Sequence, residues 1–193
     1  MNQHQSIIEV FERLEEIDQS EIELIEQCFK PINAKRKEHL IGREDAAGAF
    51  YFINKGLLRL YAYKEGEERT MFFFSENMIA GSIDSFITNR NDGFILESLE
   101  DCELLKVDRL DLNRMFAASH KLTRITLALT QHRFNYLLSF FKSFVLDSPE
   151  ERYLRLISMH PELAVRVPQH MLASFLGITP VSLSRIRKRI TSK

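Results

Sequence analysis

Five basic residues cluster near the end of the sequence, and their positive charge indicates the clearest candidate chemistry in the chain. They are Arg185, Arg187, Lys188, Arg189 and Lys193. No Asp or Glu follows Glu162, so this end of the chain is locally cationic although the net charge of the whole sequence is -1. A solvated basic helix end, favoured by the helix dipole, would show the same run. Clustered cations also neutralise phosphates, so a nucleic acid is a candidate partner.

The residues before this cluster predict a first short helix. Pro168 can open it, because the missing N–H of proline would have no partner there anyway. An apolar face at helical spacing follows: Leu172, Phe175 and Leu176. Ala173 is small, as required where two helices cross closely, and Gly177 interrupts the pattern.

A second short helix begins after Gly177. Thr179 followed by Pro180 is typical of a helix N-cap with proline at the first helical position. Its apolar stripe is Leu183, Ile186 and Ile190. Residues 167–193 therefore predict a helix-turn-helix, a motif whose second helix enters the DNA major groove.

A long helix is expected over residues 120–146, which contain neither Gly nor Pro. Two apolar stripes run along it. One stripe is Leu122, Ile125, Leu129, Tyr136, Phe140 and Phe144, and the other is Leu127, Phe134, Leu138, Phe141 and Val145. One face would suffice for packing within the chain, so the second predicts contact with the same helix of another subunit. Burial of both faces within one chain is the alternative.

Residues 31–107 predict a β-roll. Short strand-like runs span 50–54, 57–63, 70–74, 94–99 and 103–107, and glycines punctuate them. The stretch from Lys64 to Glu67 predicts a hairpin turn. Asp108 is expected to cap a short helix that contains Leu110, Leu112 and Met115.

Caps mark the remaining helices. Residues 7–14 predict a helix from the spacing of Ile7, Ile8 and Phe11, and Ser20 with Glu23 predicts a capping box for the next. Ser148, Pro149 and Glu151 predict another capping box at a hinge between domains. The expected domains are 1–116 (effector), 117–147 (dimerisation helix) and 148–193 (DNA binding).

Composition limits the class of protein. Cys28 and Cys102 are far apart, which argues against a disulfide framework or a four-cysteine cluster and favours two buried thiols in a reducing cytosol. The six histidines lack metal-ligand spacing, so no metal site is expected. Neither a signal peptide nor a membrane span is indicated, so a cytoplasmic location is expected. No nucleophile-and-base pair and no P-loop suggest an enzyme.

These features together resemble the Crp/Fnr family of bacterial transcription regulators. An α+β chain is expected, with a cyclic-nucleotide-binding-like jelly roll, a dimer helix and a C-terminal helix-turn-helix. The ending SPEERYLRLI and VPQHMLASFLGITPVSLSRIRKRI is similar to the branch common in Bacteroidetes. The resemblance implies double-stranded DNA and a second copy of the chain as partners, RNA polymerase as a further candidate, and no membrane.

The resemblance also implies an effector pocket in the roll, but the phosphate-binding pattern departs from the family's. Gly81 and Ser82 stand where cyclic-AMP binders carry Gly-Glu, and Asp92-Gly93 replaces Arg-Ser. Because Asp92 would repel a cyclic phosphate, tight binding of cyclic AMP is not expected. Arg90 could substitute only after a register shift. His132 and Arg133 on the long helix are further candidates for the pocket, or else polar contacts of the subunit interface.

The family pattern places DNA-reading side chains on the first turns of the recognition helix. The candidates are Thr179, Val181, Ser182, Ser184 and Arg185, with Arg187, Lys188 and Arg189 as phosphate contacts. Arg185 is the candidate for a bidentate guanine contact, and Val181 would meet a thymine methyl group. Two alternatives remain: a cyclic-nucleotide-fold protein-interaction module, and a cyclic-nucleotide-responsive regulator with a non-standard pocket. Effector, operator and sense of regulation stay open.

Overall fold

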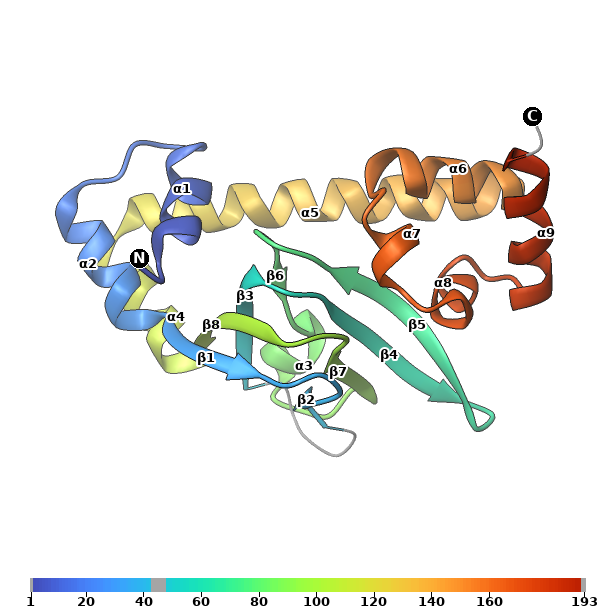
Figure 1. Ribbon diagram of the computed structural model, residues 1–193. Coiled ribbons are helices and arrows are strands. Elements are labelled where there is room, and N and C mark those ends of the chain that lie inside the picture. The colour runs from blue at the N-terminus through green and yellow to red at the C-terminus, as the bar shows by residue number, and fades with distance from the viewer. Residues whose placement is uncertain (1, 43–47, 192–193) are drawn as a thin grey trace. The chain divides into compact units, whose positions relative to one another are not determined.

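The computed structural model describes residues 2–42 and 48–191 (Figure 1). Lys193, a member of the predicted basic cluster, lies outside them. The chain forms two compact units. The first comprises residues 1–61 and 73–131, and the second comprises residues 62–72 and 132–193.

Two helices begin the first unit, α1 (Gln5–Glu12) and α2 (Gln19–Cys28). The predicted capping box of Ser20 and Glu23 is wrong. Asp18 caps α2 instead, since its carboxylate accepts from the backbone N–H of Ser20 and Glu21, and its own N–H donates to Glu21 at 3.0 Å. Both patterns obey the same spacing rule, and the acid that lies two residues earlier starts the helix.

Within residues 2–42 and 48–191, eight strands build the predicted roll as two four-stranded sheets, with orders β1-β8-β3-β6 and β2-β7-β4-β5. The strands are β1 (Lys30–Ala34), β2 (His39–Ile41), β3 (Ala49–Lys55), β4 (Leu58–Lys64), β5 (Glu67–Phe74), β6 (Ile79–Ala80), β7 (Phe94–Ser98) and β8 (Cys102–Asp108). The five predicted strands are confirmed. The sequence prediction missed β1, β2 and β6, and also the helix α3 (Ile83–Thr88).

The hairpin between β4 and β5 has the predicted turn. Glu65 and Gly66 both have positive φ, at 57° and 81°. A two-residue turn of this kind matches the right-handed twist of its strands. Strands β4 and β5 are therefore joined by a turn of only two residues.

One face of the β3–β8 pair carries the helical core of the first unit. In the antiparallel register Phe52 faces Leu105 and Phe50 faces Val107. Helices α1, α2, α4 (Arg109–Ala118) and the first half of α5 (His120–Leu146) pack on these side chains. Asp108 caps α4 as predicted, although Leu110 is 80% exposed, so the apolar face of α4 is Met115 and its neighbours.

The second half of α5 belongs to the second unit, with α6 (Pro149–Met159), α7 (Leu163–Arg166), α8 (Gln169–Phe175) and α9 (Pro180–Thr191). The capping box of Ser148 and Glu151 is confirmed. Pro168 does not open α8 from within; it is the N-cap, with an extended ψ of 139°, and the helix begins at Gln169. Within the described part of the chain, no helix is long and apolar enough to cross a membrane.

Candidate nucleic-acid interface

Helices α8 and α9 form the predicted helix-turn-helix. Gly177 has a φ of +68°, and the Ile178 N–H donates to the Ala173 carbonyl at 3.0 Å. A Cβ at Gly177 would lie 2.9 Å from a Phe144 ring carbon, so both the backbone and the space require glycine. The turn is thereby fixed against the end of α5.

The start of α9 is held by its own cap. The Thr179 hydroxyl accepts from the Ser182 N–H at 3.1 Å and lies 2.9 Å from the Ser182 hydroxyl. Leu183 is fully buried and Ile186 nearly so, and α9 packs on α8. The helix is therefore positioned by its apolar side, as the spacing predicted.

The opposite side of α9 faces solvent. Val181 is 61% exposed, and Arg185 and Lys188 are exposed as well. Across the described residues, Arg185 makes neither an ion pair nor a hydrogen bond through its side chain. Ser184 is half-buried. Val181 and Arg185 therefore lie one helical turn apart on one accessible strip.

Arg187 has a different environment from Arg185. Its Nε donates to the Tyr153 hydroxyl at 3.1 Å, and Nη2 donates to the Ala164 carbonyl at 3.3 Å. Its guanidinium also lies over the Tyr153 ring. These contacts join α9 to α6 and α7. The structure thus places this predicted phosphate contact among the residues that hold α9 in position.

Arg189 is paired within the chain too. Its Nη1 lies 2.6 Å from Glu150 Oε2, and the Arg189 side chain is 60% exposed. Because exposed ion pairs are weak, phosphate can compete with Glu150 for this cation. Arg185, Lys188 and Arg189 are therefore the cations of α9 that solvent reaches.

Two of the predicted effector residues meet in the first unit. The Ser82 hydroxyl donates to Asp92 Oδ2, and Asp92 Oδ1 accepts from the Phe94 N–H at 3.1 Å. Ser82 also caps α3 through the Ser85 N–H at 3.3 Å. Gly81 packs on Phe50, where a Cβ would lie 2.5 Å from a ring carbon. An internal carboxylate therefore occupies hydrogen-bond donors of this loop.

The other effector candidates are placed elsewhere. Arg90 is exposed, and its carbonyl accepts from the Ser85 hydroxyl at 2.6 Å. Gly93, with a φ of +79°, lies in the exposed turn before β7. His132 and Arg133 belong to the second unit, where His132 is exposed and the Arg133 guanidinium lies 5.0 Å from the Phe72 ring centre. Burial lowers the pKa of Arg133 to about 10.

The sequence prediction missed a buried charged cluster in the roll. Arg59 is 1% exposed, lies over the Tyr61 ring at 4.4 Å, and pairs with Glu97 of β7 at 3.8 Å. His39 lies 3.7 Å from the second Glu97 oxygen. An arginine between two leucines in a predicted strand was the available signal, since a charge in a central strand needs a partner.

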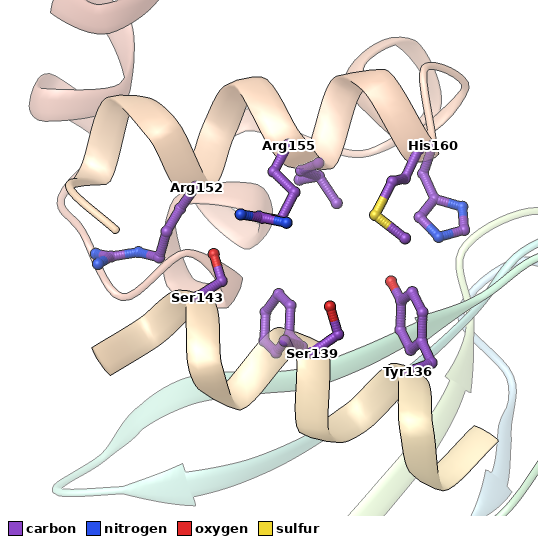
Figure 2. A pocket seen from close by; sticks show the side chains of 9 residues that line it. Tyr136, Ser139, Ser143, Arg152, Arg155 and His160 are labelled. Atoms are coloured by element: carbon purple, nitrogen blue, oxygen red, sulfur yellow. The ribbon is translucent and has the colours of Figure 1, made fainter. Parts of the chain in front are cut away.

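A pocket between α5 and α6 was also missed. Tyr136, Ser139 and Phe140 line it from α5, Arg155 and Met159 line it from α6, and His160 lines it from the C-cap of α6 (Figure 2). It is small and open to solvent. Its residues are spread over two helices, so no local sequence motif predicts it.

Comparison with known proteins identifies the fold. Residues 31–119 match the family model of the cyclic nucleotide-binding domain. FixK2 from Bradyrhizobium japonicum has a TM-score of 0.72 at 17% identity, with 85% of each chain covered. CLP from Xanthomonas campestris, described as a c-di-GMP responsive global regulator, has a TM-score of 0.69 at 21% identity, with 91% of this chain and 92% of CLP covered.

The chain has the Crp/Fnr fold. A putative cAMP-binding regulatory protein from Silicibacter pomeroyi agrees, with a TM-score of 0.66 at 17% identity over 98% of this chain and 89% of that one. No curated protein sequence matches the chain. The resemblance found in the sequence is confirmed for the fold: a cyclic nucleotide-binding domain, a long helix and a C-terminal helical region.

Proposed function

We propose that the protein is a homodimeric, sequence-specific DNA-binding transcription regulator of the Crp/Fnr type. The outward strip of α9 carries this proposal: an apolar side chain at 181 and a cation at 185 are accessible on a helix whose other face is anchored. Arginine reads guanine through two parallel hydrogen bonds, and an apolar side chain meets the methyl group of thymine. Arg185 and Val181 are therefore the proposed base contacts, with Lys188 and Arg189 on phosphates.

Dimerisation is proposed along α5. Leu127, Phe134, Leu138, Phe141 and Val145 are between 40% and 65% exposed in the single chain. Four of these, from Phe134 onward, recur at intervals of four, three and four residues, the spacing of a helix–helix seam. A paired copy would cover this stripe and give two recognition helices for two half-sites.

The roll is proposed not to bind cyclic AMP tightly. Asp92 brings a negative charge to the Ser82 loop and already engages the Ser82 hydroxyl. A cyclic phosphate would have to displace this carboxylate and meet its charge. Isothermal titration of the full chain with cyclic AMP should therefore show no saturable binding at micromolar concentrations, and such binding would overturn this part of the proposal.

DNA selection tests the main proposal. The full chain is used to enrich double-stranded sequences from a random library, and the enriched site is measured by fluorescence anisotropy at increasing salt. Specific binding with a steep salt dependence is expected. Arg185→Ala should weaken the enriched site by about 1–3 kcal/mol and relax its sequence preference. Arg13→Ala, which removes an exposed arginine of the first unit, is the matched control. No enrichment would favour a protein-interaction module instead.

Sedimentation tests the dimer. Phe141→Lys should weaken self-association at least about 100-fold, because each of two copies loses about 1.5–3 kcal/mol of apolar burial and gains a charge. Lys142→Gln changes the adjacent exposed residue and should leave the dissociation constant nearly unchanged. A wild-type chain that remains monomeric at micromolar concentrations would contradict the proposed seam.

A further inference from the structure

Arg152 joins the ends of two helices within the second unit. It lies near the start of α6, and its guanidinium donates through Nη1 to the Asp147 carbonyl at 3.0 Å and through Nη2 to the Leu176 carbonyl at 3.1 Å. Asp147 directly follows α5, and Leu176 is the C-cap of α8. Carbonyls at helix C-termini lack intrahelical partners and carry partial negative charge, so one cation satisfies both ends. We call these two hydrogen bonds the Arg152 bridge.

Phe144, in the last turn of α5, contacts both the Arg152 bridge and the turn of the helix-turn-helix. The Arg152 guanidinium lies 4.9 Å from the centre of the Phe144 ring. A Cβ at Gly177 would lie 2.9 Å from a carbon of the same ring. The contact between the cation and the ring adds to the two hydrogen bonds. The turn between α8 and α9 is therefore attached to the end of α5 by polar and by apolar contacts.

Arg155, three residues later on α6, has a different set of partners. Its Nε donates to the Asp147 carboxylate at 3.1 Å, and its side chain is half-exposed. Figure 2 shows both arginines on the side of α6 that faces α5. In the described part of the chain, the side chain of Arg152 also bonds to α8, and that of Arg155 does not. The pair therefore separates a positive charge beside Asp147 from a link between helices.

The Arg152 bridge connects α9 to the proposed dimer seam. Phe134, Leu138, Phe141 and Val145, the seam residues of the second unit, lie on the half of α5 that ends before Asp147. The separation and rotation of the two α9 helices in a dimer thus depend on where each turn sits on its own α5. On DNA, one base pair changes the separation of two half-sites by about 3.4 Å and their relative rotation by about 35°. A dimer distinguishes such steps when α9 is held firmly on α5.

We propose that Arg152 determines which half-site spacing the homodimer accepts, by fixing the turn between α8 and α9 to the end of α5. This role rests on the proposed function, because it requires a dimer that binds DNA. Arg152 is a positioning residue, and the proposed base contacts remain Val181 and Arg185 on the exposed strip of α9. Without the bridge, α9 keeps these contacts, but the paired helices reach half-sites at neighbouring spacings as well.

Three duplexes measure spacing selectivity. The first is the site enriched by the full chain, the second has one base pair inserted between its half-sites, and the third carries a single half-site; fluorescence anisotropy gives each dissociation constant. The wild type should prefer the enriched spacing at least about tenfold over the insertion, because DNA or protein must deform to fit the insertion. Arg152→Ala should reduce this preference to less than about threefold, and change the single half-site constant by less than about twofold.

Two further variants isolate the bridge. Arg155→Ala is the matched control, since it removes the same charge from the same helix and keeps the Arg152 bridge, so it should retain the wild-type preference. Arg152→Lys keeps the charge but lacks the planar fork that reaches two carbonyls, so it should relax the preference as Arg152→Ala does. Circular dichroism checks that each variant is folded.

Hydrogen exchange tests the bridge without DNA. Exchange in the full chain is followed by mass spectrometry in peptides that cover residues 173–181 and in peptides of strand β8. The Gly177 and Ile178 N–H groups donate to carbonyls of α8, so their exchange reports local opening of the turn. Arg152→Ala should speed exchange in 173–181 at least about threefold and leave β8 unchanged, because the opening is local. Arg155→Ala should match the wild type in both segments.

The outcomes separate this role from the proposed function. Unchanged exchange in 173–181 of Arg152→Ala would overturn the bridge, whatever the chain does with DNA. Full spacing preference in Arg152→Ala, or an equal loss of preference in Arg155→Ala, would overturn the spacing role. Loss of single half-site binding together with the preference would also overturn it, since Arg152 would then serve only the fold of the helix-turn-helix. A chain that selects no DNA would fail the proposed function and with it the spacing role, and the exchange result would still decide whether Arg152 holds the turn.

Discussion

Arg59 in the roll and Arg185 in α9 have opposite environments: one is buried and paired within the chain, and the other is exposed to solvent. Arg59 in β4 is 1% exposed and is surrounded by an aromatic ring and the Glu97 carboxylate. Arg185 in α9 is exposed, and its side chain has no polar partner within the described residues. A buried charge must be satisfied inside the chain, whereas an exposed one is available for a partner. Burial and partners, more than residue type, separate a structural arginine from a binding one.

Arg187 shows that this distinction also operates within one helix. It lies two residues from Arg185, yet it contacts Tyr153 and the Ala164 carbonyl. A basic run in a sequence therefore mixes arginines that hold a helix with arginines that read a partner. Substitutions that remove one charge at a time separate the two groups.

Arg59→Ala should have the largest effect on stability. The variant leaves Glu97 buried without its arginine partner, so the free energy of unfolding should fall by about 3–5 kcal/mol. Urea unfolding at neutral pH measures this change. Arg69→Ala is the matched control: Arg69 lies 2.6 Å from Glu67, but this pair is exposed and should contribute at most about 1 kcal/mol.

The double variant Arg59→Met with Glu97→Leu sharpens the same comparison. If the loss in Arg59→Ala comes from an unpaired buried carboxylate, removal of both charges should restore most of the stability. A double variant as unstable as Arg59→Ala would mean that the arginine acts through its packing on Tyr61 instead.

Arg187→Ala and Arg185→Ala should separate stability from recognition. Arg187→Ala loses two hydrogen bonds and a ring contact, so the free energy of unfolding should fall by about 1–3 kcal/mol. Arg185→Ala should change it by less than about 0.5 kcal/mol, as is usual for an exposed residue without contacts. Urea unfolding of both variants checks this. Equal losses would contradict the assignment of Arg187 to positioning α9.

Local signals predicted the C-terminal helices well. Thr179-Pro180, Gly177 and the apolar spacing each act within a few residues, so the helices α8 and α9 followed from the sequence. The same holds for the Glu65-Gly66 turn. The environment of Arg187 did not follow, because Tyr153 lies 34 positions away and reaches it only through tertiary packing.

Non-local strand pairing explains why β1 and β6 could not be predicted from the sequence. Strand β1 pairs with β8 some 70 residues later, and neither β1 nor the two-residue β6 has a periodic pattern of its own. The hydrogen bond between Ser82 and Asp92 likewise depends on the fold of α3, which was not predicted. The family resemblance placed Asp92 in the same expected pocket as Ser82, and the fold shows the hydrogen bond between them.

The comparison of buried and exposed charges also applies to acidic residues, where the expected effect on stability is smaller. Burial of Glu21 raises its pKa, but the Lys121 ammonium at 2.8 Å, the Asp18 N–H and the Ser119 hydroxyl outweigh burial, so the pKa lies below its usual value of 4.5. Ionised Glu21 therefore stabilises the folded state above that value, and this contribution is lost as the pH falls through the lowered pKa.

Glu21→Gln should accordingly be less stable than the wild type near neutral pH, and the difference should shrink in acid.

Glu151 is the control, since it occupies the equivalent place in the other capping box but is exposed, and the Ser148 hydroxyl and N–H lower its pKa. Salt should weaken the effect of Glu151→Gln more than that of Glu21→Gln, because exposed charges are screened more strongly. Urea unfolding across pH and salt measures both. A Glu21→Gln difference that stays constant in acid would show that packing, and not charge, places Glu21 in the first unit.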